Sequence, residues 1–499
     1  MTSTSSLFIR PALAQRCAIA AAAALMVAGC TVGPDYHGAP EVASDATHAA
    51  SFVRTPATGM ATTPAVSQWW ITLHDPELTH LIEEALEQSP TIHAAQARLR
   101  ESRAGLQEQQ RDALPKASAS AADIRVRAPD TSILQSNSNN SGGSSGSSGS
   151  TGRGPVDLYE IGFDASWEID LFGGTRRAIE AASAQSDATE ADLADAHVQL
   201  AAEVAQAYID LRDQQQRLDL VRKSADLEAQ MLDLTRQRRA RGVASDLDVE
   251  RIRTQVETTK SDLLPLDAQI TESLDQLALL TGREPGALDA ELNPVAPLPV
   301  LPETVAIGDP AALMRQRPDI RSAERKLAAQ NAQIGEREAD WFPKLTLFGD
   351  LGFTAADPGH LMRKDNFSWV GIPYLQWNAL DFGRVKARVD QANASRDEAE
   401  AQYQSAVLGA LRDADVALSR YGHQRENVYS LRTVESSASH TAQLTRQRYQ
   451  AGVSTALDWL DAERTRYSAE QNRISGDAAL IKDYVSLQKA LGLGWMPAG

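Results

Sequence analysis

Two segments of this chain have nearly the same sequence, and they lie 210 residues apart. Leu234–Asp248 has the sequence LTRQRRARGVASDLD and Leu444–Asp458 has LTRQRYQAGVSTALD, so nine of fifteen positions are identical. At a second separation, of 228 residues, Pro115-Lys116 recurs as Pro343-Lys344. Repetition over this length predicts two copies of one structural unit, and it limits the fold to architectures that can be built from tandem repeats.

The two separations differ because one copy is longer than the other. The extra residues fall at Ser136–Gly154, which is rich in Ser and Gly and has no equivalent in the second copy. This composition predicts a flexible loop. We therefore expect a first repeat within 30–312, together with an N-terminal segment and a linker, and a second repeat with a C-terminal tail within 313–499.

The first 29 residues have the organisation of an export signal. Arg10 and Arg16 precede an apolar run, Ala18–Ala28, that is too short to span a membrane as a helix. The run leads into Val27-Ala28-Gly29-Cys30, which resembles the lipobox of bacterial lipoproteins. We expect residues 1–29 to be a lipoprotein signal peptide and Cys30 to be the lipid attachment site. The alternative is an ordinary signal peptide with an incidental cysteine.

Two segments predict very long helices. Residues 175–241 contain no Gly or Pro, and residues 385–451 contain no Pro. A continuous helix of this length extends about 100 Å, which exceeds the size of a globular domain. Its two adjacent apolar stripes favour a helix that packs on both sides, as in a barrel of helices, although a coiled coil is an alternative. Shorter helical stretches, expected to stack end to end beside each long helix, cover 90–113 with 246–280 and 318–340 with 456–491.

Four segments between the helices predict β-strands. In the clearest of them, Tyr159, Ile161 and Phe163 alternate with polar or small residues, which is the period of a strand with one apolar face. The expected strands are about 116–128, 156–169, 344–355 and 367–381. Four strands cannot close a membrane barrel, and an open sheet edge is not tolerated in lipid. If these strands lie in a membrane, the protein must be an oligomer.

Several function classes have little support in the sequence. The formal net charge of −17 argues against a nucleic-acid-binding protein. The nine histidines form no metal-binding pattern, and no phosphate-binding loop is present. Gly142–Gly146 matches the GxSxG pattern of hydrolases, but it lies in low-complexity sequence without a preceding strand. We expect no enzymatic activity, no cofactor and no metal site.

Six short motifs, in this order and spacing, resemble those of the TolC-like outer-membrane factors, in the NodT-type lipoprotein subgroup of multidrug efflux systems. The resemblance covers the whole chain after the signal peptide. The motifs are CTVGPDY at Cys30–Tyr36, WW at Trp69-Trp70 with DPEL at Asp75–Leu78, DLFGGTRR at Asp170–Arg177, RPDI at Arg317–Ile320, DFGR at Asp381–Arg384 and ALGLGW at Ala490–Trp495.

The resemblance implies an α+β membrane protein that is a homotrimer. Its 12-stranded outer-membrane β-barrel, with four strands from each chain, would continue into the periplasm as a 12-helix α-barrel. The implied function is passive conduction of drugs and other small molecules out of a Gram-negative cell. A conduit for type I protein secretion or another export system is the alternative among channels. An envelope-bracing lipoprotein coiled coil is the alternative outside them, but it would not explain the strands.

The resemblance also implies a gate beyond the second repeated segment. Leu457, Asp461 and Arg464 match the family's constriction, in which leucines narrow the pore, aspartates form an acidic ring and arginines join neighbouring helices. Asp458 precedes Asp461 by three residues and would share its helix face. Rings of carboxylates favour cations. A solvated helix face is the alternative for each of these acids.

The helix turns are implied to be the periplasmic tips of the channel. Gly242, Val243, Gly452 and Val453 would dock a periplasmic adaptor (membrane fusion) protein, which links the channel to an inner-membrane resistance-nodulation-division transporter. Near the tips, Asp248 and Tyr449 are implied to form an inter-helix latch, and Ser454 stands where some relatives have a latch arginine. For Asp246 or Asp248 the alternative is a helix N-cap after the glycine turn.

Overall fold

The structure is a computed structural model that describes residues 31–56, 58–61, 63–126 and 156–495. The lipid attachment expected at Cys30 and the Ser/Gly-rich loop lie outside these residues. Within them, no helix is both long enough and apolar enough to cross a membrane. The chain forms two compact units, of which one comprises Met1–His37, Arg103–Ala184 and Ala328–Asp397, and the other Gly38–Ser102, Gln185–Leu327 and Glu398–Gly499.

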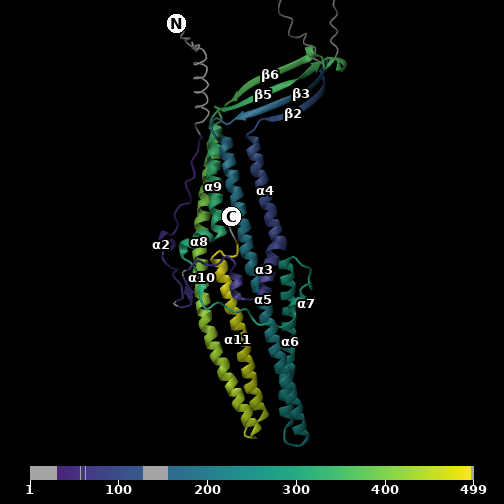
Figure 1. The fold of residues 1–499 in the computed structure, drawn as a ribbon, viewed down its shortest axis with the longest axis vertical. Helices are drawn as coiled ribbons and strands as arrows, with labels where there is room; N and C mark the ends of the chain where they lie inside the picture. Colours follow the sequence, from purple (N-terminus) through teal and green to yellow (C-terminus); the bar gives the residue numbers. More distant parts are fainter. Residues whose placement is uncertain (1–30, 57, 62, 127–155, 496–499) are drawn as a thin grey trace, which may run out of the picture. The chain divides into compact units, whose positions relative to one another are not determined.

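The first unit contains a sheet of four antiparallel strands in the order β2-β3-β5-β6 (Figure 1). The strands are β2 (Lys116–Val126), β3 (Val156–Ile169), β5 (Lys344–Ala355) and β6 (Phe367–Gln376). The outer edges of β2 and β6 have no strand partner among the described residues. The four strands expected from the sequence are therefore confirmed, except that residues 127–128, expected at the end of the first strand, lie outside the described residues.

The register gives this sheet one predominantly apolar face. Phe163, Leu351 and Trp369 are direct cross-strand neighbours and therefore lie on the same face. Their exposures are 59%, 49% and 75%. Asp164 and Asp350 are paired on the opposite face. Because the described part of the chain leaves these large apolar side chains uncovered, the apolar face requires an apolar environment outside the chain.

Strand β6 is shorter than the sequence predicted. It ends at Gln376, which pairs with Lys344 at the start of β5, and does not reach Asp381. The next partner in the ladder would be Pro343, which has no backbone N–H to donate. Beyond the strand, the Trp377 indole Nε1 donates to the Trp341 carbonyl oxygen at 3.1 Å. The prediction of a strand over 367–381 was therefore wrong in its last five residues.

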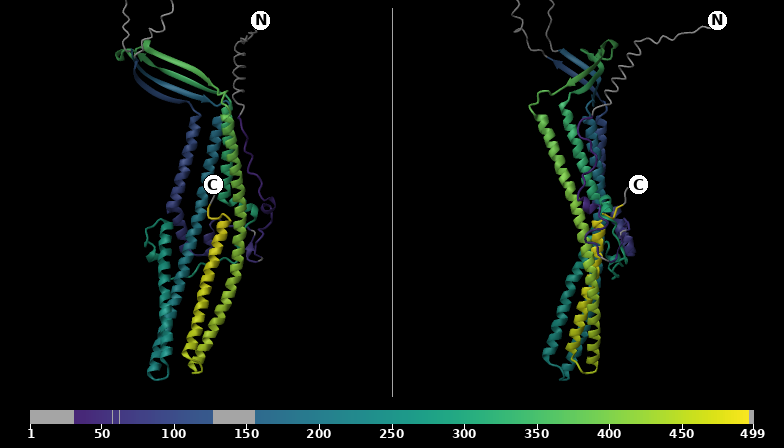
Figure 2. Two further views of the ribbon diagram at one scale, coloured as in Figure 1. Left: turned by 180° about the vertical axis from the view of Figure 1, so that it is seen from behind. Right: turned by 90° about the vertical axis from the view of Figure 1, so that its left-hand side faces the viewer.

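The two long helices are α5 (Gly174–Ala240) and α10 (Arg384–Gln450), each of 67 residues. Each forms a hairpin with the helix that follows it, α6 (Asp246–Thr281) or α11 (Ala456–Ala490). Both views of Figure 2 show α10 and α11 side by side. Two long helices in tandem copies are thus confirmed, with ends within one residue of those expected.

Shorter helices begin where the hairpins end. The Arg317 guanidinium, directly before α9 (Pro318–Glu338), donates to the carbonyl oxygen of Ala490, the last residue of α11, at 2.8 Å. In the other copy, Gly282 follows α6 with a φ of 77° and lies against the Gln88 carbonyl, just before α4 (Pro90–Asp112). The structure thus brings together the helix ends that were expected to stack.

The core of the second unit is built from short segments packed on the long helices. Trp69, Trp70 and Tyr208 are almost completely buried in it. Buried Arg212 of α5 donates to the Leu292 and Pro294 carbonyls at 3.1 and 2.9 Å and so fixes the inter-repeat linker. The short elements of the chain are α2 (Ser44–Thr47), β1 (Met60–Ala61), η1 (Trp69–Leu73), α3 (Pro76–Gln88), α7 (Asp289–Leu292), β4 (Val305–Ala306), α8 (Pro310–Gln316), η3 (Ala339–Trp341), η4 (Pro358–His360) and η5 (Lys364–Asn366).

The two copies share individual contacts at the junctions between helices and strands. In each copy a tryptophan indole donates to a carbonyl just before a strand, and a lysine at the strand start pairs with an aspartate. The contacts are Trp167 to Ala113 at 3.0 Å and Lys116–Asp112 at 2.7 Å in the first copy, and Trp377 to Trp341 at 3.1 Å and Lys344–Asp340 at 3.3 Å in the second. The repeat is therefore preserved in side-chain contacts as well as in topology.

Candidate functional site

The repeated sequence forms the turn at the tip of each hairpin. Gly242 and Gly452 have φ values of 75° and 73°, in the left-handed region that favours glycine. The valine that follows each glycine donates its backbone N–H back into the helix, Val243 to Arg238 at 3.0 Å and Val453 to Arg448 at 2.9 Å. This pattern is a Schellman helix ending. Val243 and Val453 are both 67% exposed.

After each turn, a reciprocal pair of hydrogen bonds caps the next helix. The Asp458 N–H donates to the Thr455 hydroxyl at 3.1 Å, and the Thr455 N–H donates to the Asp458 carboxylate at 2.8 Å. Ser245 and Asp248 form the same capping box in the first copy. The N-cap of α6 is thus Ser245, so the alternative that Asp246 or Asp248 is the N-cap was wrong. Asp246 instead forms an ion pair with Arg239 at 2.7 Å.

The cap has an electrostatic consequence for Asp458. The backbone hydrogen bond from Thr455, followed by that from its hydroxyl, lowers the pKa of Asp458 below the ordinary aspartate value. Asp248 also has a lowered pKa, in this case because the Ser245 hydroxyl and then its backbone N–H donate to the carboxylate. Both caps therefore favour ionised carboxylates at the start of a helix, where the helix dipole also favours negative charge.

Three of the four candidate gate residues line one groove between α10 and α11. The groove has a volume of about 1140 Å³. Leu457, Asp458 and Asp461 contribute from α11, and Ser454 from the turn. The rest of its lining consists mainly of small hydroxyl and apolar side chains with one arginine, namely Thr433, Val434, Ser437, Ala438, Thr441, Thr445, Arg448, Ala462 and Thr465.

Arg464, the fourth candidate, is joined to this group through a hydrogen bond. Its guanidinium donates to the Asp461 carboxylate at 2.9 Å, three residues away on the same helix. The two side chains are 59% and 70% exposed, so solvent screens the pair and its contribution to stability is small. Within the chain, Arg464 thus partners Asp461 of its own helix.

The two candidate latch residues have different partners. The Asp248 carboxylate accepts from Ser245 in the capping box. The Tyr449 hydroxyl accepts from the Arg238 guanidinium at 3.3 Å, which joins α10 to α5. The structure therefore does not bring Asp248 and Tyr449 into a direct hydrogen bond.

Sequence reasoning missed Trp459. Its ring stacks on Tyr449 at a centroid distance of 5.3 Å and an interplanar angle of 24°. Together the two rings pack against a cluster formed by Met231, Leu232, Ile252, Val256 and Leu460. An indication was present in the sequence, since Trp459 lies beside Leu457 and Leu460 in the first turns of the helix.

Sequence reasoning also missed a buried acid in the first hairpin. Glu228 is only 2% exposed, and its Oε1 accepts from the Gln255 amide at 3.4 Å and the Ser224 hydroxyl at 3.5 Å. Its Oε2 is buried without a hydrogen-bond partner among the described residues. Burial raises the pKa of Glu228, although hydrogen bonds from Thr259, Gln255 and Ser224 oppose the shift. Its spacing from Ser224 and Thr235 on one buried helix face was the available signal.

The described residues contain no group of three or more His, Cys, Asp or Glu side chains arranged to hold a metal ion. The groove and the tips thus present carboxylates, hydroxyls and exposed apolar side chains. Such a surface can attract cations by its charge and can bind another protein through its exposed apolar side chains.

Comparison with known proteins identifies the family. The model of the family described as "Outer membrane efflux protein" matches residues 81–283 and 310–493. The outer membrane protein OprJ of Pseudomonas aeruginosa is 29% identical over 95% of this chain and 94% of its own length. The antibiotic efflux pump outer membrane protein ArpC of Pseudomonas putida is 29% identical over 95% of both chains.

Solved structures agree with this assignment. The structure of the outer-membrane channel OprN is 34% identical, covers 94% of this chain and 100% of its own, and superimposes with a TM-score of 0.82. The resemblance drawn from the sequence motifs is therefore confirmed, as is the fold. The chain belongs to the outer membrane efflux protein family, with a TolC-like fold and the function of an outer-membrane efflux channel.

Proposed function

We propose that this chain forms a homotrimeric channel through which a tripartite pump passively releases drugs and other small molecules. The observation that carries the proposal is the groove at the second hairpin tip, where Leu457, Asp458 and Asp461 lie together. The name of the relative ArpC, an antibiotic efflux protein, supports the substrate class.

The open sheet supports the trimer. Within the described part of the chain, the outer edges of β2 and β6 lack strand partners, and backbone groups at such edges must be paired in a membrane. Strands from neighbouring chains can provide the pairing, and three chains would supply twelve strands. The exposed apolar face with Phe163, Leu351 and Trp369 would then face lipid.

In the assembled channel, the second hairpin tip would act as the gate. Leu457 would narrow the passage, and Asp461 would provide the acidic ring, with Arg464 as its counter-ion. Asp458 also lines the groove, but its carboxylate is engaged in the cap of α11. The donors in that cap are neutral and leave the carboxylate charged, so both aspartates would contribute negative charge to the groove, and that of Asp461 would be offset in part by Arg464.

The tips would dock the adaptor. Gly242-Val243 and Gly452-Val453 present the same turn with an exposed valine, so each chain would offer two equivalent contacts to a periplasmic adaptor protein. The adaptor would link them to an inner-membrane resistance-nodulation-division transporter. Near the tips, Tyr449 and Asp248 would restrain the helices, Tyr449 through Arg238 and Asp248 through the cap of α6.

A lipid at Cys30 would anchor the protein to the outer membrane. The sequence before this residue resembles a lipobox, and two or more acyl chains on one residue are enough for stable membrane anchoring. The anchor would act together with the trimeric barrel, whose strands would also hold the channel in the membrane.

The gate is tested by ion selectivity in planar bilayers. Replacing Asp458 and Asp461 together with Ala should raise conductance and reduce the preference for cations. Asp461→Asn alone should produce a smaller loss of preference, because it leaves the ionised Asp458 in the groove. Asp246→Asn, which removes an exposed acid outside the groove, is the matched control and should leave selectivity unchanged. Wild-type selectivity in the double variant would contradict the acidic ring.

A further inference from the structure

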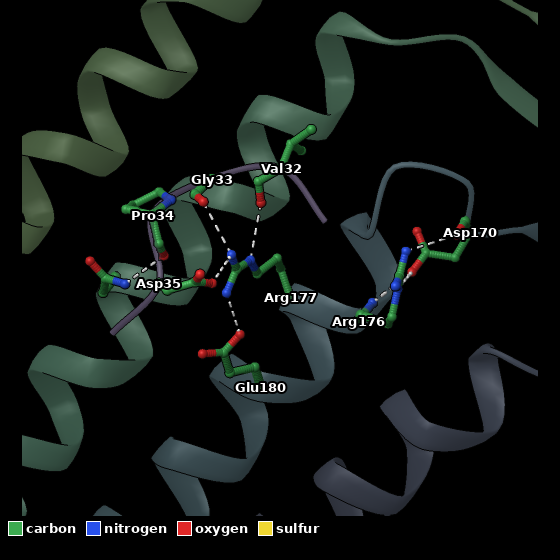
Figure 3. A network of polar contacts seen from close by, with 9 residues as sticks. Val32, Gly33, Pro34, Asp35, Asp170, Arg176, Arg177 and Glu180 are labelled. Atoms are coloured by element: carbon green, nitrogen blue, oxygen red, sulfur yellow. Dashed lines mark hydrogen bonds and ion pairs between the residues drawn. The ribbon is translucent and has the colours of Figure 1, made fainter. Parts of the chain in front are cut away.

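The segment that follows Cys30 is held in place by one buried arginine. Arg177, in the first turn of α5, is 4% exposed. Its guanidinium donates to the Val32 carbonyl at 3.0 Å, the Gly33 carbonyl at 3.1 Å and the Asp35 carboxylate at 2.6 Å (Figure 3). The remaining nitrogen donates to Glu180 at 2.7 Å. A single side chain thus binds three of the first residues after the lipobox.

Backbone and amide contacts hold the same segment on other sides. The Val32 N–H donates to the Phe172 carbonyl at 3.1 Å, which ties the segment to the loop after β3. The Asn331 amide of α9 donates to the Pro34 carbonyl at 2.9 Å. Thr31 packs against Gly173, where a Cβ would lie 2.9 Å from the Thr31 Cα. Thr31–Asp35 is therefore fixed at every residue.

Two glycines allow the segment to lie directly on α9. Gly33 has a φ of 92°, and a Cβ at this position would overlap with the backbone of Gly335. A Cβ on Gly335 would in turn lie 2.8 Å from the Val32 carbonyl oxygen and 2.9 Å from the Arg177 side chain. The contact is thus backbone against backbone, and it requires glycine on both sides.

We call the contacts of Arg177 with residues 32, 33, 35 and 180 the clamp, and its chemistry requires arginine. The planar guanidinium presents several donors in fixed directions, whereas a lysine ammonium is a single point charge and cannot bind two carbonyls and two carboxylates in this geometry. Because Val32 and Gly33 present their carbonyls to Arg177, loss of its side chain would leave these acceptors unpaired. Two of the motifs noted in the sequence, CTVGPDY and DLFGGTRR, therefore meet in one contact.

The clamp lies beside aromatic side chains of the same compact unit. Phe172, whose carbonyl accepts from Val32, stacks on Phe342 with ring centroids 4.5 Å apart. Trp341 and Trp377 are joined by a hydrogen bond and are 46% and 60% exposed. Exposed aromatic residues next to membrane strands are typical of the membrane–water interface.

We propose that Arg177 is the positioning residue of the lipid anchor, since its clamp fixes the residues after Cys30 so that the acyl chains enter the membrane beside Phe172 and Phe342. The inference rests on the proposed lipid modification of Cys30. A free segment of residues 31–37 would let the anchor move over roughly 15 Å. The clamped segment instead fixes the position from which the anchor extends. The anchor and the barrel are thereby held in a fixed relation.

The test uses the full-length protein labelled in cells with a palmitate analogue that carries a photoreactive diazirine. After irradiation in isolated outer membranes, the cross-linked peptides are identified by mass spectrometry. In the wild type, we expect cross-links to concentrate on the peptides that contain Phe172 and Phe342. In R177Q and R177K the fraction of all cross-links that falls on these two peptides should decrease about fivefold or more, as expected for a tether that is free to move over roughly 15 Å. The total incorporated label should stay unchanged.

The neighbouring arginine provides a matched control. Arg176 pairs with Asp170 on the other side of the helix and does not contact the segment (Figure 3), so R176Q should keep the wild-type cross-links. Conductance distinguishes a positioning role from a purely structural one. The planar-bilayer conductance of R177Q should equal that of the wild type. Loss of conductance in R177Q that still assembles would show that Arg177 merely supports the fold, and it would overturn the positioning role. If R177Q does not assemble, N331A removes only the bond to Pro34 and should reduce the share about twofold.

The outcomes separate the two proposals. A wild-type cross-link pattern in R177Q, or in N331A where R177Q does not assemble, overturns the clamp. Label that persists in C30S, or is absent from the wild type, contradicts the lipid modification itself and with it the proposed anchor. Label that depends on Cys30 and disperses only when Arg177 or Asn331 is replaced supports both.

Discussion

The two helical hairpins, α5–α6 and α10–α11, have the same turn and the same capping box, but the space between their helices differs. In the first hairpin Met231 and Ile252 pack in one cluster, and the Gln255 amide donates to Glu228 across the helices. In the second, 210 residues later, the same four positions hold Ala438, Thr441, Ala462 and Thr465, which line the groove of about 1140 Å³. Larger side chains close the first hairpin, and smaller ones open the second.

The two hairpins also differ in whether their acidic residues are buried or exposed. The first hairpin buries its acid, Glu228, at a position where the second has Ala438. The second hairpin exposes Asp461 in the groove, at a position where the first has Arg251. The duplicated sequence therefore specifies the scaffold, and the substitutions between the copies distinguish a closed hairpin from one that presents charge.

The largest effect on stability is expected from a cavity between the helices of the first hairpin. Ile252 is 1% exposed and belongs to the cluster with Met231 and Trp459. Ile252→Ala should lower the local stability of the first hairpin by about 2–5 kcal/mol, because it leaves a cavity in a packed core. Amide hydrogen exchange of α5 and α6 in the assembled protein measures this free energy.

The equivalent position in the second hairpin is the control. Ala462→Ile adds a side chain to an open groove, where substitutions change stability by about 0.5 kcal/mol or less. A similar loss of stability from both substitutions would show that the two hairpins are packed alike, and it would contradict the difference in packing between them.

The buried acid should make the first hairpin sensitive to pH. Because burial raises the pKa of Glu228 in the folded state, folding favours its protonated form. The corresponding stability is fully present below the unfolded pKa of about 4.3 and is lost as pH rises through the folded pKa. Glu228→Gln should therefore stabilise α5 and α6 at pH 8, by about 1.4 kcal/mol for each unit of the shift, and have little effect at pH 4.

Hydrogen exchange at several pH values measures this dependence. Asp226→Asn removes an exposed acid two residues away on the same helix and serves as the control. A Glu228→Gln variant whose stabilisation does not grow with pH would contradict the assignment of a costly buried carboxylate.

Local sequence signals specified the long helices, the glycine turns and the ends of β3 and β5. They failed where a partner distant in the chain decides the outcome. Strand β6 ends where the facing chain reaches Pro343, and Arg177 acts on carbonyls 144 and 145 residues away. Asp458 was predicted as a pore residue from its spacing to Asp461, whereas its bonds to Thr455 follow from the T-x-x-D spacing that was also present in the sequence.

The smallest effect is expected from the caps, where the two hairpins should respond equally. Ser245→Ala and Thr455→Ala each remove the hydroxyl that accepts from an aspartate N–H, and each should cost about 1 kcal/mol at the start of α6 or α11. Ser454→Ala is the control, since its buried hydroxyl has no hydrogen-bond partner among the described residues and does not cap a helix. Hydrogen exchange in the first turns of both helices compares the three variants. Equal losses of stability at both caps, with no loss at Ser454, would show that the hairpins differ only in the side chains between their helices. Unequal losses would show that their turns also differ.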